Sequence, residues 1–346
     1  MISTVDNKHK RMVWIDVVKA MAIFLVLWGH CIQHLVSDFV NNPVFLFICS
    51  FHMPLFMAMS GFFAYKLIGR RLKVVIVPKF LQLILPAILF SILIWIQCRI
   101  LNQTEKSILQ ALWYYFWFLK SLFVCVILFY VAIKVFKKRW IGLMTMFLVS
   151  QFLAFIPHLY FLQLGYMFPC FIFGYILNCH KEYFYRYAKV IAPLCIVIFM
   201  LLFAKFDKEV CFVPYLFNNS LQIGGGKWLI FICYKLLIGI IGSLGVMSVI
   251  YIVCRKLQGN KTLGLLARAG QYTLAIYILQ AFLVESWLRW FFSFSVLPCS
   301  CLFSMVYAPF ISFIGVLLSI LIYRCLCKIK LDWMFDFNRY PFRLWK

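Results

Sequence analysis

Long apolar runs alternate with short polar or basic connections along almost the whole chain. The runs are about 20 residues long, which is the length that a helix needs to cross the hydrocarbon core of a bilayer. The pattern predicts an all-α integral membrane protein, a bundle of about ten transmembrane helices. The predicted spans cover residues 12–36, 43–65, 74–98, 111–135, 140–156, 162–178, 189–205, 228–254, 271–292 and 306–327.

The first apolar run differs from the others because it holds three ionisable residues, Asp16, Lys19 and His30. Such groups are costly in hydrocarbon unless they face protein or a water-filled cavity, so they indicate a functional site. At about 100° per residue, the step from Lys19 to His30 returns to within roughly 20° of the same helix face. The two residues lie about 16 Å apart along the axis. We call this face, which Gln33 and His34 continue, the polar stripe.

Composition excludes a soluble domain, because 65% of the residues are hydrophobic and 13% are charged, whereas soluble domains are about one quarter charged. The net charge of +24 could indicate nucleic-acid binding, but the basic residues are divided among many connections and form no single patch. Connections rich in Lys and Arg alternate with connections poor in them, so the positive-inside rule predicts that both termini are cytoplasmic. We expect a multi-pass protein of the cell (cytoplasmic or inner) membrane, with the lipid bilayer and no nucleic acid as a partner.

The 14 cysteines lie almost entirely in apolar runs, without a CxxC pair or a Cys/His spacing typical of metal ligands. We interpret them as small packing residues and expect no metal site. One membrane domain is predicted over residues 1–330. Residues 331–346 are predicted to form a basic, aromatic cytoplasmic tail on the membrane surface.

Two motifs resemble the membrane acyltransferase 3 family, in the branch related to sugar O-acetylases. Residues 14–30 read WIDVVKAMAIFLVLWGH and resemble the opening span of the family. Asp16, Gly29 and His30 match its pattern, and Lys19 stands where the family usually has Arg. The second motif, FHMPLF at 51–56 followed by SGF at 60–62, is similar to another family segment. Weaker matches follow in the family's order over most of the chain, at residues 70–78, 117–119, 168–175 and 273–277.

The resemblance implies transfer of an acyl group, most often acetyl from acetyl-CoA, to a sugar hydroxyl of an envelope or extracellular glycan. Acetyl-CoA, or another acyl-CoA, would be a co-substrate, with no permanently bound cofactor, and the acceptor would be a glycan or a lipid-linked sugar. Attack of a hydroxyl on a thioester needs a base that titrates near neutral pH, and histidine is the usual choice. His30 is therefore the candidate general base or transient acyl acceptor, with Asp16 and Lys19 as its catalytic companions on the polar stripe.

The acyl donor carries phosphates that need cationic partners on the cytoplasmic side. Arg70, Arg71 and Lys73 precede the third span, and their side chains form strong charge-assisted bonds with phosphate. They are the candidate donor-binding residues, although they could equally do no more than set the topology. Lys19 could contact the donor deeper in the membrane, but it lacks the bidentate fork of Arg.

Five other residues are candidate substrate contacts, and each has a structural alternative. A histidine beside a helix-bending proline could contact substrate or bond to the backbone, and a serine before a glycine could lie where helices pack closely. The tryptophan could stack on a sugar or only pack, and the tyrosine could line the same cavity. An intramembrane glutamate could line a cavity or pair with Arg289. The residues are His52, Ser60, Trp117, Tyr277 and Glu285.

The polar stripe also has two interpretations without acyl transfer. Asp16 and Lys19 could form a structural ion pair, with Lys19 reaching the cytoplasmic surface, and His30 could be a bonded core histidine. The stripe could instead line the path of a transporter or flippase for a lipid-linked sugar or polysaccharide. Transporters often contain internal repeats, and the charged first span has no counterpart in spans six to ten, which disfavours transport.

Overall fold

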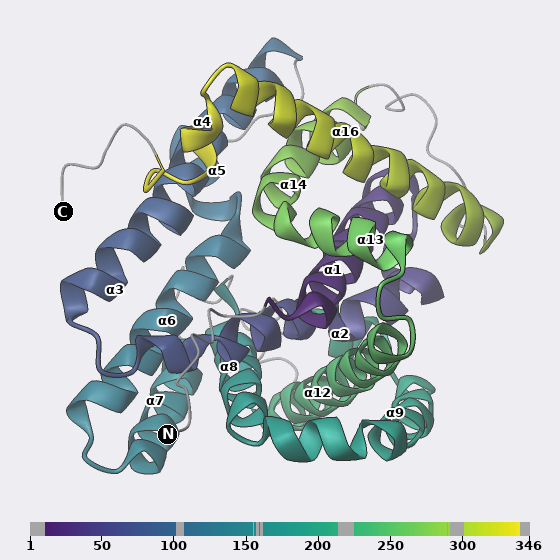
Figure 1. The fold of residues 1–346 in the computed structure, drawn as a ribbon. Coiled ribbons are helices and arrows are strands. Elements are labelled where there is room, and N and C mark those ends of the chain that lie inside the picture. The colour runs from purple at the N-terminus through teal and green to yellow at the C-terminus, as the bar shows by residue number, and fades with distance from the viewer. Residues whose placement is uncertain are drawn as a thin grey trace.

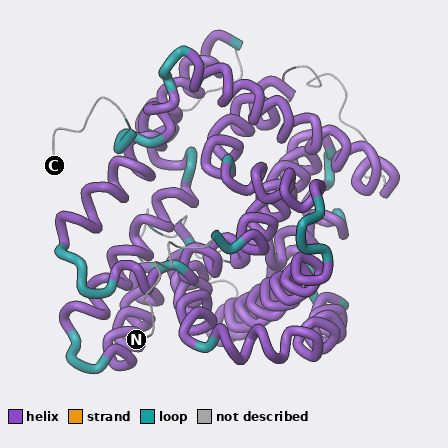
Figure 2. Tube along the Cα trace, in the orientation of Figure 1, coloured by secondary structure: helices purple, strands orange, loops and turns teal. Residues whose placement is uncertain are grey.

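The structure, a computed structural model, describes residues 11–101, 107–154, 156, 159, 162–213, 225–288, 290 and 301–339. Helices make up nearly all of this part of the chain, and no strand occurs in it (Figure 2). The main helices are α1 Val13–Leu35, α2 Pro43–Phe62, α3 Leu72–Lys79, α4 Leu85–Ile100, α5 Ile108–Tyr114, α6 Trp117–Val135, α7 Arg139–Leu153, α8 Leu164–Cys179, α9 Lys181–Phe203, α10 Lys208–Phe212, α12 Gly225–Lys256, α13 Lys261–Gln271, α14 Thr273–Gln280 and α16 Ala308–Lys328.

The all-helical membrane architecture predicted from the apolar runs is confirmed. Seven helices of the described chain are long and apolar enough to cross a bilayer: Val13–Leu35, Pro43–Phe62, Leu72–Ile100, Trp117–Val135, Lys181–Phe203, Gly226–Lys256 and Phe303–Lys328. Three further predicted spans coincide with shorter apolar helices, Arg139–Leu153, Leu164–Cys179 and Thr273–Leu288. The count of ten spans and the cytoplasmic position of both termini stay predictions.

Helix α1 lies inside the bundle (Figure 1) and packs against α2, α12, α13, α14 and α16. Its apolar residues are buried on most sides, including Ile23, Leu27 and Ile32. The polar stripe therefore faces protein, as the cost of ionisable groups in lipid requires.

Helix α2 begins at an N-cap and crosses α8 at very short range. The Asn42 side chain accepts hydrogen bonds from the amides of Val44 and Phe45, at 3.0 and 3.1 Å, which satisfies donors that the first turn leaves unpaired. A Cβ on Gly61 would lie 1.9 Å from the carbonyl oxygen of Phe171, and a Cβ on Gly174 would lie 1.9 Å from that of Ala58. Small residues allow such approach between membrane helices. The close contact predicted at residues 60–61 is therefore made with α8.

Several long helices change to a wider π-helical turn along their length. The third apolar helix passes through η3, Phe80–Ile84, and the ninth predicted span changes from α14 into η6, Ala281–Leu288. A third such turn, η7 at Phe303–Tyr307, leads into α16. π-Turns are frequent at functional sites, and η6 carries Glu285.

The described beginning of the predicted tail folds back onto the bundle. Phe335, in the short helix η8 (Asp332–Phe335), is 2% exposed, and its ring centroid lies 4.9 Å from that of Phe90 and 5.1 Å from that of Tyr323. The Asn338 side chain donates a hydrogen bond of 2.9 Å to the carbonyl of Pro78, beside the π-turn. This segment thus packs beside the π-helical turn of the third apolar helix. Residues 340–346 lie outside the described residues.

Candidate active site

At the N-terminal end of the polar stripe, one carboxylate serves two cations. Asp16 is 5% exposed. Its Oδ2 accepts a hydrogen bond of 2.5 Å from Arg11 Nε, and its Oδ1 lies 3.9 Å from Lys19 Nζ. Helix α13 crosses directly behind it, since a Cβ on Gly270 would lie 1.8 Å from the Asp16 carbonyl oxygen. The fold thus holds Asp16 in place and leaves Lys19 partly exposed.

Lys19 faces a small cavity of about 210 Å³. Two predicted substrate contacts, Ser60 and Tyr277, also line it, together with Lys79. The Ser60 hydroxyl donates to the carbonyl of Phe56 at 3.0 Å, so it is bonded within its own helix. The Lys79 ammonium donates to Gln82 at 3.0 Å. The small cavity therefore combines two cations with an apolar wall.

His30 lines a second cavity of about 520 Å³. We call it the large cavity because it is larger than the small cavity beside Lys19. His52, Trp117 and Tyr277 line it as well, so four of the predicted site residues meet there. The two cavities share three wall residues, Val26, Met53 and Tyr277. The two cavities together therefore adjoin the polar stripe from Lys19 to His30.

The side chain of His30 lies beside a carboxylate that comes from a distant part of the chain. His30 Nε2 is 3.7 Å from Glu285 Oε1, and the Gln280 side chain donates a hydrogen bond of 2.7 Å to the same oxygen. His30 Nδ1 is buried and has no hydrogen-bond partner within the described residues. The carboxylate can orient the imidazole. Arg289, the alternative partner of Glu285, lies outside the described residues.

A second histidine completes a group that could hold a metal ion. His34 lies one turn after His30, and the two rings stack with centroids 6.0 Å apart. One ligand atom from each of His30, His34 and Glu285 falls within 4.8 Å of the others. Two histidines at i and i+4 with a carboxylate form a chemically suitable set for zinc. The sequence alone predicted no metal site, because it gave no sign that Glu285 joins these histidines.

His52 is positioned by its own helix. Its Nδ1 lies 2.8 Å from the carbonyl oxygen of Ile48. Because a carbonyl can only accept, Nδ1 carries the proton, and the Nε2 of the neutral ring is an acceptor. His52 therefore makes the predicted backbone bond and also lies on the cavity wall. Its contact with substrate stays a prediction.

The three predicted donor-binding residues, Arg70, Arg71 and Lys73, are exposed around the start of α3 and line neither cavity. In this segment, the backbone carbonyl of Arg70 accepts a hydrogen bond of 3.0 Å from the Tyr130 hydroxyl. Phosphates held there would lie outside the two cavities.

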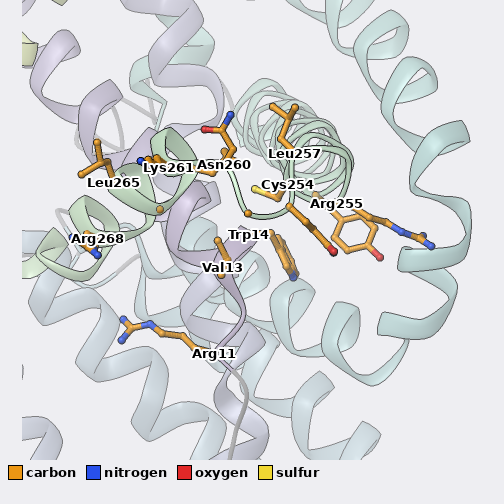
Figure 3. A pocket seen from close by; sticks show the side chains of 15 residues that line it. Arg11, Val13, Trp14, Cys254, Arg255, Leu257, Asn260, Lys261, Leu265 and Arg268 are labelled. Carbon is orange, nitrogen blue, oxygen red and sulfur yellow. The ribbon is translucent and has the colours of Figure 1, made fainter.

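A third cavity, of about 990 Å³, lies where the start of α1, the end of α12 and α13 meet. Figure 3 shows Arg11, Arg255, Lys261 and Arg268 around it. No acidic residue is among the described residues that line it. We call it the basic cavity. Its charge suits an anion, but it contains neither Lys19 nor His30.

Lys235 of α12 and Tyr166 of α8 also line the large cavity and were not among the predicted site residues. Lys235 is 4% exposed and Tyr166 is 2% exposed. An isolated lysine in an apolar span is an unusual feature that could have indicated Lys235. Nothing in the pattern distinguishes Tyr166 from other aromatic packing residues.

Parts of this chain are similar to known proteins. The chain is 26% identical to a nodulation protein, NolL, of Mesorhizobium japonicum over 224 residues, which cover 60% of this chain and 59% of the relative. It is 42% identical to a protein of the same name from Sinorhizobium fredii over 60 residues, 16% of each chain. The chain thus spans about three fifths of the first relative's length. No solved structure is significantly similar.

A family model described as an acyltransferase domain matches residues 12–324, nearly the whole chain and all of both cavities. This match agrees with the resemblance of the motifs around Asp16 and His52. The protein belongs to the acyltransferase 3 family.

Proposed function

We propose that this protein moves an acetyl group from cytoplasmic acetyl-CoA to a sugar hydroxyl of an envelope or extracellular glycan, in the cytoplasmic or inner membrane. The observation that carries the proposal is the position of His30. Its side chain lines the large cavity, and its Nε2 lies 3.7 Å from Oε1 of Glu285. A base oriented by a carboxylate is the arrangement needed to activate a hydroxyl.

The proposed reaction uses the two cavities for the two substrates. The acceptor sugar occupies the large cavity, whose volume of about 520 Å³ is within the range of small-molecule sites. The donor's acyl end arrives through the small cavity, where Lys19 and Lys79 attract its phosphates or polar arm. The shared wall at Val26, Met53 and Tyr277 is where acyl group and hydroxyl would meet.

The chemical step needs one proton acceptor. His30 takes the proton of the sugar hydroxyl as its oxygen attacks the thioester carbonyl carbon. The new carbon–oxygen bond forms, the carbon–sulfur bond breaks, and the CoA thiolate leaves and recovers the proton from the imidazolium. In the covalent alternative, the unprotonated ring nitrogen attacks the thioester carbonyl carbon and displaces the CoA thiolate. The sugar oxygen then attacks the acyl-imidazole, the bond from the acyl carbon to the ring nitrogen breaks, and the hydroxyl proton passes to the thiolate. Glu285 orients the imidazole in the first route.

The proposal is tested by comparing the acyl content of surface glycan from cells that produce wild-type protein or His30→Ala at equal membrane abundance. We expect His30→Ala to abolish the protein-dependent acylation, and His180→Ala, an exposed histidine outside both cavities, to retain it. Unchanged acyl content in His30→Ala would remove His30 from the reaction.

A second experiment distinguishes acyl transfer from transport. Purified protein in liposomes, supplied with a lipid-linked sugar and no acyl donor, should leave the sugar lipid in its original leaflet. Movement of that lipid without donor would favour the transporter or flippase reading of the polar stripe.

A further inference from the structure

Lys120 and Lys235 both lie within apolar helices of the bundle, and their surroundings differ. Lys120 of α6 donates to the carbonyls of Leu112, Trp113 and Tyr115, at 2.6, 2.9 and 2.6 Å. An ammonium has three donors, so the end of α5 satisfies all of them. Lys120 is thus a structural cap for that helix end.

Lys235 of α12 has fewer hydrogen-bond partners than Lys120 in the described part of the chain. Its Nζ donates to the carbonyl of Cys211 and lies 4.9 Å from the centroid of the Tyr166 ring. No carboxylate forms an ion pair with it among the described residues. A cation that is 4% exposed with donors left over is costly unless something else completes its shell. Lys235 forms part of the wall of the large cavity, so a partner can approach it from there.

Tyr166 forms the cavity wall beside Lys235. Its ring lies 4.9 Å from the Lys235 ammonium, while its hydroxyl is buried and lies against Gly239, where an added Cβ would be 2.8 Å from it. The hydroxyl therefore does not face the cavity. No acidic residue is among the described residues that line this cavity, so none of them would repel an anion. The Lys235 ammonium can donate a charge-assisted bond to a carboxylate or phosphate oxygen.

We propose that Lys235 forms a subsite for an oxyanionic group carried by the acceptor, so that the acceptor is a sugar acid or a sugar phosphate. This inference rests on the proposed function, in which the large cavity holds the acceptor. It narrows the acceptor class from any glycan to an anionic one. The shared chemistry is an oxygen anion, and a carboxylate and a phosphate are its two sources.

The test measures binding to the purified, detergent-solubilised full chain by calorimetry, without any acyl donor. The ligands are methyl glucuronide, glucose 1-phosphate and the neutral methyl glucoside. We expect at least one anionic sugar to bind about tenfold tighter than the neutral one, as a charge-assisted bond predicts. Whether methyl glucuronide or glucose 1-phosphate has the greater advantage identifies carboxylate or phosphate as the group recognised.

Variants assign the preference to the subsite. Lys235→Met should remove it, while Lys227→Met, the same change at an exposed position on the same helix, should leave it intact. Tyr166→Phe deletes only a buried hydroxyl that lies against Gly239 and should also leave the preference intact. If the wild-type protein binds all three sugars equally, or if Lys235→Met keeps the preference, the subsite is wrong.

Failure of this inference is distinguishable from failure of the proposed function. Binding is measured without donor, so a protein that transfers no acyl group can still show the anionic preference. Conversely, a protein that acylates a neutral glycan through His30 but binds no anionic sugar would overturn only the subsite.

Discussion

The two ends of the polar stripe differ in how far along the chain their partners lie. At one end, Asp16 is paired with Arg11 and Lys19, its neighbours on the same stretch of chain. At the other end, His30 meets Glu285, which η6 brings from the far side of the sequence. The first end can form as soon as α1 forms, whereas the second requires the whole bundle. This difference suggests a division of labour: the near end stabilises the protein and attracts the donor, and the far end performs the chemistry.

The largest effect should come from the far end. His30→Ala should lower acetyl transfer by about a hundredfold or more, because it removes the general base. Glu285→Gln should cost about tenfold, since it leaves the base but not the carboxylate that orients it. If the two side chains work as one unit, the double variant should be no slower than His30→Ala alone.

The measurement is initial rate with purified protein, labelled acetyl-CoA and a fixed acceptor. Multiplicative losses in the double variant would mean that His30 and Glu285 act separately. The same assay, run after treatment with a chelator, should give an unchanged rate. A loss that added zinc restores would assign His30, His34 and Glu285 to a metal site.

The next effect concerns stability at the near end. Asp16→Asn keeps the shape of the side chain but removes the charge shared by two cations. We expect a loss of about 1–2 kcal/mol in the free energy of unfolding, below the full cost of a broken buried pair because Arg11 is largely exposed. Thermal unfolding in detergent measures it, with Glu285→Gln as the comparison. Equal or greater destabilisation by Glu285→Gln would reverse the proposed division of labour.

A smaller and more selective effect is expected at Lys19. Lys19→Met should raise the KM for acetyl-CoA about tenfold, since one charge-assisted contact is lost, and should change kcat little. Lys19→Arg, which keeps the charge, should stay close to wild type. A fall in kcat with an unchanged KM would place Lys19 in the chemical step, together with His30.

The smallest effects separate two surfaces that could hold the donor's phosphates. Arg71→Ala changes an exposed residue next to α3, outside the three cavities described above, and should alter the KM for acetyl-CoA by no more than about twofold, the usual result for a screened surface charge. Arg268→Ala tests the basic cavity in the same assay. A larger effect at Arg71 would restore the donor site predicted at residues 70–73, and a larger effect at Arg268 would move it to the basic cavity.

Much of the fold could be predicted because the membrane imposes strict rules on the sequence. Apolar runs long enough to span hydrocarbon identify helices such as α1 and α2, since an unsatisfied backbone is excluded from lipid. Breaks within helices were harder to predict. The fourth predicted span divides into α5 and α6 at Phe116, whose φ is 53°. No local signal in an apolar aromatic stretch indicates such a turn.

The sequence predicted several residues of the candidate site, but only the structure showed which side chains lie beside them. The spacing within 14–30 placed Asp16, Lys19 and His30 on one face of a helix, because helix geometry fixes that relation without any other element. Residues such as Lys79, Tyr166 and Lys235 were not among the predicted site residues, since each lies on a different helix and joins a cavity only through packing.

The sequence by itself determined the helical membrane class, the resemblance to an acyltransferase family and the polar stripe, all of which follow from local periodicity and from the cost of charge in lipid. Only the tertiary structure decided that His30 lies beside Glu285 and His34, that the stripe adjoins two cavities, and that Lys120 is saturated while Lys235 is not. The reason is physical: a helix determines which of its own residues share a face, but the neighbours of that face depend on how the other helices pack.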